Sequence, residues 1–363
     1  MLTEDILNTN STAREFYGPR LYALDEQALA KLKTLKPYKP VLAAIHAWFW
    51  IFVLVKSYLH FPILIYFYPV VILLIAGRAG VFLQLAHEAA HGLISKNRFN
   101  DWFGNWIATY PIGLDFRGYA EPHVRHHACV NRSCDPISDR EKYRICDIRN
   151  PKLRLLFLKD ILGITALTVR FLYQQPLSNK EKADMRDYLE TNNDSYIRFT
   201  NPEETSLELV KKYLSIGLVQ LLIFAILFNF NPIHYLLLWI VPLITCHMFL
   251  MRVRGIAEHG LGIQLAIPDL EELNRGTLYT RSFGTPMNQY SFPLFTIAER
   301  LLIGSLNVYY HHEHHLFPKV PYYNLPALHC LIANRENAIN PHIFAKGYLD
   351  CLFFPLRHQP SRD

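Results

Sequence analysis

Residues 213–251 read YLSIGLVQLLIFAILFNFNPIHYLLLWIVPLITCHMFLM and contain no Asp, Glu, Lys or Arg. A helix needs about 20 mainly apolar residues to cross a bilayer, so this stretch is long enough for two crossings. Asn229, Asn231 and Pro232 lie near its middle and are residue types common in turns. The stretch therefore predicts a hairpin of two membrane-spanning helices, over about residues 213–230 and 233–251.

A second pair of apolar runs lies earlier in the chain. No charged residue occurs between Lys39 and Lys56, and none occurs from Ser57 to Gly77. We expect spans over about residues 40–56 and 60–80, the first of which is short. A soluble helical protein that buries these runs in its core is the alternative, and their length disfavours it. The sequence therefore predicts an all-α integral membrane protein with about four spans in two hairpins.

The basic residues predict how these spans are oriented. The first turn contains only Lys56 and the turn at 229–232 contains no Lys or Arg, whereas the rest lie before residue 40, between 78 and 212, or after 251. Loops rich in Lys and Arg stay in the cytoplasm. We therefore expect a cytosolic N-terminal segment (1–39), a membrane domain (40–330) with a cytosolic cap (81–212 and 252–330), and a cytosolic C-terminal tail (331–363). No dense basic stripe occurs, so nucleic acid is not an expected partner.

Histidines carry the strongest functional signal. The chain has 17 of them, and eight fall into three clusters: His87 and His91; His123, His126 and His127; His311, His314 and His315. Residues three and four positions apart lie on one face of a helix, so each cluster can direct its imidazoles toward one point. His259, after the last apolar run, is a ninth candidate. All nine follow the predicted cytoplasmic ends of the spans, so a single site can be assembled from them.

The number of imidazoles points to two metal ions. A structural zinc site needs only four ligands, and nine suit two ions that keep positions open for a small molecule. Neutral imidazole binds iron as well as zinc, copper and nickel, and iron, unlike zinc, can change oxidation state. The sequence thus predicts a two-iron centre able to activate O₂. Four nearby acids could orient the imidazoles through their second ring nitrogens: Glu88, Asp135, Glu258 and Glu313. His329 is isolated, and we expect it at the surface.

The order of the three clusters, with one hairpin before the first and another before the third, resembles the membrane fatty acid desaturase superfamily. The segment Asn307-Val-Tyr-Tyr-His-His-Glu-His-His-Leu-Phe-Pro318 is similar to a signature of that family, and so is Glu258-His259. The resemblance covers about residues 40 to 330. It implies a four-helix membrane scaffold under a cytosolic cap that holds two non-haem irons, and it favours His311 over the extra His312 as a ligand. It also implies an enzyme that uses O₂ and two electrons to desaturate or hydroxylate an unactivated alkyl chain.

Three features distinguish the chain from branches of that family. The spacing from His87 to His91 is one residue shorter than in the acyl-CoA Δ9 branch, and the third cluster begins with His311 where front-end desaturases have Gln. No His-Pro-Gly-Gly motif occurs, so we expect no fused cytochrome b5 domain. These features favour the branch that contains methyl-end and lipid-linked acyl desaturases, sphingolipid desaturases and carotenoid ketolases.

The leading hypothesis is therefore an O₂-dependent desaturase of a lipid acyl chain, supplied with electrons by a separate ferredoxin or cytochrome b5. A hydroxylase or ketolase on the same scaffold is the nearest alternative. A metal transporter with His-rich cytoplasmic loops is a third possibility. It predicts several polar ligands within the spans. His46 and His247 are the only histidines well inside a span, and the nine candidates lie outside.

Overall fold

The computed structural model describes residues 25–130, 135, 148–172, 205–261, 280–283, 293–339 and 343–353. Within these ranges the secondary structure is helical, and the one β feature is an isolated parallel bridge between Ser282 and Phe344. The predicted all-α fold is confirmed. Residues 1–24 of the predicted N-terminal segment and 354–363 of the predicted tail lie outside the described residues.

Four helical units are long and apolar enough to cross a membrane. The first pair is α4 (Tyr38–His60) and a unit made of the 3₁₀-helix η2 (Pro62–Phe67) and α5 (Tyr68–Ala90). The second pair is α12 (Ser206–Phe228) and a unit made of α13 (Pro232–Tyr235), the π-helix η5 (Leu236–Ile240), α14 (Val241–Ile244) and α15 (Cys246–His259). The predicted two pairs of apolar helices are therefore present, and α5 and α15 continue beyond their apolar runs into the histidine motifs.

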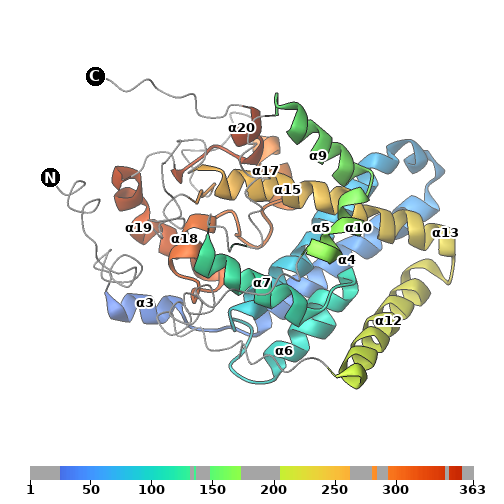
Figure 1. Ribbon diagram of the computed structural model, residues 1–363, viewed down its shortest axis with the longest axis horizontal. Helices are drawn as coiled ribbons and strands as arrows, with labels where there is room; N and C mark the ends of the chain where they lie inside the picture. Colours follow the sequence, from blue (N-terminus) through green and yellow to red (C-terminus); the bar gives the residue numbers. More distant parts are fainter. Residues whose placement is uncertain are drawn as a thin grey trace.

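The remaining helical elements lie outside these four units. In order they are α3 (Glu26–Leu32), α6 (Phe99–Phe103), η3 (Gly104–Thr109), η4 (Tyr110–Ile112), α7 (Phe116–Cys129), α9 (Pro151–Ile161), α10 (Ile164–Leu172), α17 (Pro293–Leu302), α18 (His311–Leu316), η8 (Tyr322–Asn324), α19 (Leu325–Ile339) and α20 (Tyr348–Phe353). Figure 1 shows α3, α18 and α19 at one end of the protein and α12 and α13 at the opposite end. The short helix α18, which carries the third histidine cluster, thus lies away from the α12–α13 turn.

The turn between α12 and α13 forms as its residues predict. Asn229 ends α12 in the left-handed conformation, with φ 50° and ψ 43°, which asparagine tolerates better than most residues. Asn231 caps the next helix, because its side-chain oxygen accepts a hydrogen bond from the His234 amide at 3.1 Å. Pro232 follows as the first helical residue, where its missing N–H costs nothing.

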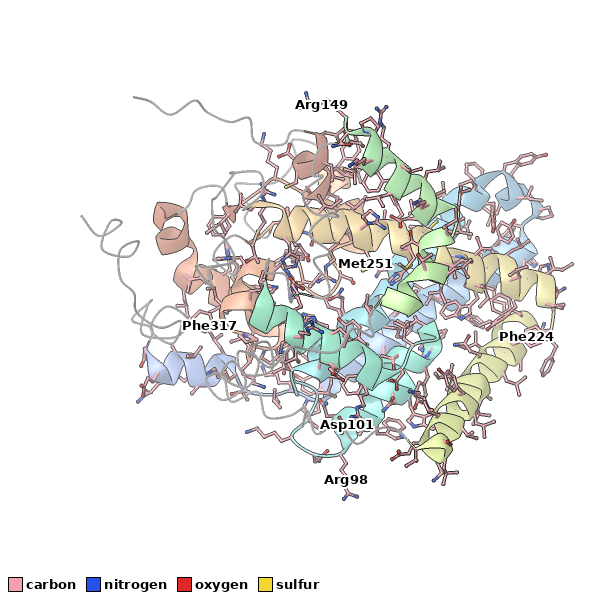
Figure 2. The ribbon with its side chains drawn as sticks, viewed as in Figure 1. Arg98, Asp101, Arg149, Phe224, Met251 and Phe317 are labelled. Atoms are coloured by element: carbon pink, nitrogen blue, oxygen red, sulfur yellow. The ribbon has the colours of Figure 1, made fainter. Side chains whose placement is uncertain are left out.

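The outer faces of the spans are apolar. On α12, Leu214 is 68% exposed and Ile226 is 64% exposed, and large apolar side chains on α4 are similarly uncovered. Continuous apolar surface of this kind is unfavourable in water and is covered by lipid chains in a bilayer. Figure 2 shows Arg98 and Arg149 at opposite outer edges of the protein, both distant from Phe224 on α12. The chain is accordingly an integral membrane protein.

The spans pack through aromatic rings and small residues. Trp48 on α4 stacks on Trp239, with ring centroids 5.6 Å apart, which joins the first hairpin to the second. A Cβ at Gly77 would lie 2.9 Å from Leu302 Cα. Glycine at this position therefore allows α5 and α17 to pack closely, as small residues do between membrane helices.

The half-buried amide of Gln220 on α12 joins neighbouring helices through complete hydrogen bonding. The Gln220 amide nitrogen donates to the carbonyl oxygens of Tyr110 and Pro111 at 2.7 and 2.8 Å. Its oxygen accepts from the Tyr235 hydroxyl at 2.8 Å and the Trp239 indole at 3.2 Å. Polar groups among apolar helices are retained when every donor and acceptor has a partner, and Gln220 meets that condition.

Candidate metal centre

The first histidine pair stands where a membrane helix ends. α5 is continuous from Tyr68 to Ala90, so His87 lies in its last turn and His91 is its C-cap residue. Gly92 follows with φ 68°, a left-handed conformation that glycine adopts without strain and that commonly ends a helix. This end is packed against α7 and against the loop before α19. Both imidazoles therefore leave the helix on the side where the other histidines lie.

The second cluster is carried by α7. Asp115 caps this helix by accepting a hydrogen bond from the Gly118 amide at 2.8 Å, and the spacing of His123, His126 and His127 then follows from helical geometry. His123 and His127 face the α5 pair, with the Nε2 atoms of His91 and His123 2.8 Å apart. His126 is turned toward α15, and its ring centroid lies 4.5 Å from that of His259.

The last three candidates come from the short helix α18, which joins both parts of the site. His311, the first residue of α18, has its Nε2 2.9 Å from Nε2 of His259 at the end of α15. His314 faces the other way, with its Nε2 3.1 Å from Nε2 of His127.

The turn before α18 contains Leu306 and Asn307 at φ 54° and 55°. Asn307 is held there by donating to the Tyr322 carbonyl at 3.1 Å.

All nine predicted histidines meet in two adjacent groups that could each hold a metal ion. Within each group, one potential ligand atom per residue lies within 4.8 Å of every other; the first group is His87, His91, His123, His127 and His314, and the second is His126, His259, His311 and His315. Every one of these side chains is between 1% and 6% exposed. We call them the five-histidine group and the four-histidine group.

The ring nitrogens are arranged as metal ligands would be. Two nitrogens bound to one ion at about 2.1 Å, at a right angle to each other, lie about 3 Å apart, close to the Nε2 separations of 2.8 to 3.1 Å between the paired rings. Within the described chain, no hydrogen-bond partner reaches the buried Nε2 of His87, Nε2 of His126 or either ring nitrogen of His315. Buried polar atoms left in this way call for a ligand or ion, so the residues fit a bound metal.

Burial also keeps the imidazoles in the form that binds metal. The pKa values of five ligand candidates lie well below the usual 6.5, because burial penalises the charged ring and because neighbouring imidazoles disfavour a second positive charge: His123, His127, His311, His314 and His315. Neutral imidazole has a free lone pair on one nitrogen. The site is therefore ready to coordinate a cation at neutral pH without first releasing protons.

The four predicted carboxylates differ in how closely they contact the candidate metal ligands. Asp135 contacts His126 Nδ1 through both of its oxygens at 2.9 Å, and Glu258 lies 3.4 Å from His311 Nδ1. Glu88 is 3.7 Å from His87 Nδ1 and accepts a hydrogen bond from the Tyr322 amide at 3.0 Å. Glu313 instead contacts Nδ1 of His329. Asp135 therefore has the most direct contact with a candidate ligand.

His329 is not a surface residue, contrary to expectation. It is 6% exposed and pairs with Glu313. Glu313 lies on α18 between His312 and His314. The extra histidine, His312, is fully buried and has its Nδ1 2.9 Å from the Thr280 hydroxyl. Neither belongs to the metal-binding groups. Both contacts fix α18 from the side opposite the candidate ligands.

Two residues near the four-histidine group were missed in the sequence. Arg254 donates from Nε to both oxygens of Glu258 at 2.9 Å, and the Tyr348 hydroxyl donates to Glu258 at 3.2 Å. Arg254 and Glu258 are four residues apart on α15, a spacing that predicts such a pair. Tyr348 is 90 residues from Glu258 in sequence and has no local signal of this role.

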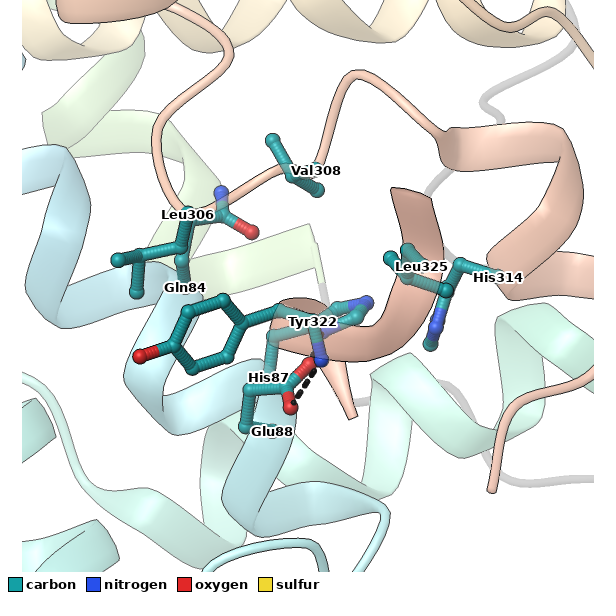
Figure 3. A pocket seen from close by; sticks show the side chains of 8 residues that line it. All are labelled: Gln84, His87, Glu88, Leu306, Val308, His314, Tyr322 and Leu325. Atoms are coloured by element: carbon teal, nitrogen blue, oxygen red, sulfur yellow. Dashed lines mark hydrogen bonds and ion pairs between the residues drawn. The ribbon is translucent and has the colours of Figure 1, made fainter. Parts of the chain in front are cut away.

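A small pocket borders the five-histidine group. Its lining includes Gln84, His87 and Glu88 of α5, and Figure 3 shows His314 and Leu325 across the space from Gln84. Its open volume is about 10 Å³, the space of about one water molecule. Pockets that hold whole small molecules measure about 300–1,000 Å³, so this one has room for a single water-sized group beside two candidate ligands.

Comparison with known proteins agrees with this geometry. A family profile described as fatty acid desaturase matches residues 62–345, which contain all nine histidines. Dihydrorhizobitoxine desaturase of Bradyrhizobium elkanii is 28% identical over an alignment of 269 positions, which covers 71% of this chain. The alignment spans 65% of that relative, slightly under two thirds of its length. The resemblance seen in the sequence is confirmed: the chain belongs to the fatty acid desaturase family.

Proposed function

We propose that this protein is an O₂-dependent desaturase that introduces a double bond into an unactivated alkyl chain of a lipid, using two irons. The observation that carries the proposal is the convergence of nine buried imidazoles, in two adjacent groups, at the ends of apolar helices. The overall reaction is R–CH₂–CH₂–R′ + O₂ + 2e⁻ + 2H⁺ → R–CH=CH–R′ + 2H₂O. The chemistry that bound iron supplies is O₂ activation and C–H cleavage, which acid and base side chains cannot provide.

The chain's own residues hold and orient the ions in this proposal. The five-histidine group binds one iron and the four-histidine group binds the other. Asp135 fixes the ring of His126 through Nδ1, so that Nε2 faces the site. Glu258, itself held by Arg254 and Tyr348, lies 3.4 Å from His311 Nδ1 without a hydrogen bond and would fix that ring less directly. Partners of this kind set the tautomer and direction of a ligand imidazole.

Burial gives the site its second property, exclusion of water. Each of the nine imidazoles is at most 6% exposed, so the side chains around the two groups exclude water and other solutes. A closed site of this kind would protect the O₂ chemistry that bound iron supplies from side reactions. The substrate must therefore enter between side chains and displace any solvent at the site.

We place the site on the cytoplasmic side. α5 and α15 are the second spans of their hairpins, and both carry candidate ligands at their C-terminal ends, which supports a single membrane face for the site. The basic residues outside the spans favour the cytoplasm for that face. Electrons then come from a soluble or membrane-anchored ferredoxin or cytochrome b5. Such carriers are commonly acidic, and basic surface residues suit their docking.

Desaturation is proposed in preference to hydroxylation because the relative from Bradyrhizobium elkanii is itself named a desaturase. The test is expression in a host of known lipid composition under ¹⁸O₂, followed by mass spectrometry of fatty acids, sphingolipids and carotenoids. A product lighter by two hydrogens and without ¹⁸O supports the proposal. A product that carries one ¹⁸O identifies a hydroxylase or ketolase. The His314→Ala variant serves as the inactive control.

A further inference from the structure

The pocket beside the five-histidine group contains a buried amide without a hydrogen-bond partner. Gln84 is 2% exposed, and nothing in the described chain bonds to its Oε1. Gln220, a half-buried amide on α12, has partners for both its nitrogen and its oxygen. A buried acceptor that is left alone costs free energy. Something outside the described chain therefore donates to Gln84.

Gln84 is placed next to the proposed chemistry. It lies three residues before His87 on α5, so the two side chains share one face of the helix. His87 and His314 line the same pocket and both belong to the five-histidine group. Figure 3 shows the Gln84 amide on the side of Leu306, with His314 across the pocket. A group bound by Gln84 would therefore sit beside the proposed iron.

The rest of the pocket limits what that group is. Leu306, Val308 and Leu325 make an apolar wall, which favours hydrocarbon on either side of the donor. Glu88 already accepts a hydrogen bond from the Tyr322 amide. The open volume of about 10 Å³ admits one water-sized polar group rather than a whole molecule. These features suit one O–H group on an alkyl chain.

We propose that Gln84 determines substrate specificity by accepting a hydrogen bond from a hydroxyl that the substrate carries close to the carbons that lose hydrogen. The inference rests on the proposed function and narrows it. The substrate is then a chain with a polar donor near the reaction point, rather than a plain saturated hydrocarbon segment.

The test measures binding, so that it does not depend on turnover. Purified full-length, iron-loaded protein in detergent is kept free of O₂ and mixed with methyl hydroxyoctadecanoates that carry the hydroxyl at different positions. Each is paired with its O-methyl ether, which has the same chain but cannot donate. Affinity is obtained from the concentration dependence of the ligand-induced rise in Tm. We expect wild type to bind at least one hydroxyl probe about five- to tenfold more tightly than its ether.

Three variants make the result specific. Gln84→Leu should abolish the preference for the hydroxyl, and Gln84→Glu, which keeps an acceptor at the same length, should retain most of it. Gln220→Leu removes a half-buried, fully hydrogen-bonded amide elsewhere in the spans and should lower Tm without changing the preference. The inference is overturned if wild type prefers no hydroxyl probe over its ether, as a pocket that holds only water would behave, or if Gln84→Leu keeps the preference.

The outcome separates this inference from the proposed function. Protein that forms an O₂-dependent desaturated product but shows no hydroxyl preference refutes the role of Gln84 alone. Protein that prefers the hydroxyl through Gln84 but forms no oxidised product under ¹⁸O₂ refutes the proposed reaction and leaves the binding site standing.

Discussion

The Nε2 atoms of His91 and His123 lie 2.8 Å apart, although the two residues belong to different helices and are separated by 32 positions in the chain. Both rings are buried, and burial holds the pKa of His123 well below its usual value. Two neutral imidazoles brought together in this way can share one hydrogen bond or bind one cation. A similarly short distance between Nε2 atoms recurs for His259 and His311 and for His127 and His314. This repetition favours cation binding over a single shared hydrogen bond.

The two groups should lose iron separately when their ligands are removed. His259→Ala takes one of four imidazoles from its group, whereas His312→Ala removes a buried ring that belongs to neither. We expect His259→Ala to retain about one iron per chain, because a group left with three imidazoles holds its ion poorly while the five-histidine group is intact. His312→Ala should retain about as much iron as wild type. Plasma mass spectrometry of purified variants measures this. Equal iron loss in both would contradict the assignment of the groups.

Asp135 should tune iron binding without being a ligand. Asp135→Asn keeps the size of the side chain but weakens its hold on His126 Nδ1. Loss of such a partner typically lowers metal affinity or activity about 10- to 100-fold. Competition with a chelator gives the affinity, and Asp101→Asn at the outer edge is the matched control. Unchanged iron affinity in Asp135→Asn would show that the contact has no orienting role.

The buried pair Arg254–Glu258 should be needed for stability. Arg254→Met leaves the Glu258 carboxylate with the Tyr348 hydroxyl and without its cation. Breaking a buried ion pair at one end costs about 3–5 kcal/mol, so we expect a marked fall in Tm in detergent. The double variant Arg254→Met, Glu258→Gln removes the stranded charge and should recover part of the loss. A double variant less stable than the single one would argue against a charge effect.

Cys351 should resist modification until the pH is high. Burial raises the pKa of this thiol from 9.0 to about 11, whereas Cys330 is exposed. The neutral thiol is favoured in the fold, so this contribution to stability is complete below pH 9 and declines as the pH rises toward 11. At pH 9, iodoacetamide should label Cys330 and leave Cys351 largely unmodified, as peptide mass spectrometry would show. Rapid labelling of Cys351 in folded protein would contradict its burial.

Much of the site could be predicted from sequence because its signals are local. The apolar runs define the spans, and the histidine spacing places imidazoles on common helix faces. The grouping follows the same rule, since His87–His91, His123–His127 and His311–His315 are pairs four residues apart and each pair stays within one group. His126 and His314 are displaced from those pairs around the helix and therefore face the other group.

The remainder depends on contacts between distant segments. Tyr348 reaches Glu258 only because α20 packs against α15, and nothing near Tyr348 in sequence indicates this. His329 has no histidine neighbour at helical spacing, which suggested a surface position, but α19 packs against α18 and brings it to Glu313. Gln84 is unremarkable in sequence, and its lack of a partner becomes visible only once Leu306, Val308 and Leu325 enclose it.

Anomalous diffraction at the iron absorption edge, from crystals of the full-length protein, tests the central claim most directly. The account predicts two iron peaks, one within reach of His87, His91, His123, His127 and His314 and the other within reach of His126, His259, His311 and His315. A single peak, peaks away from these imidazoles, or fully active protein whose peaks belong to zinc would contradict it.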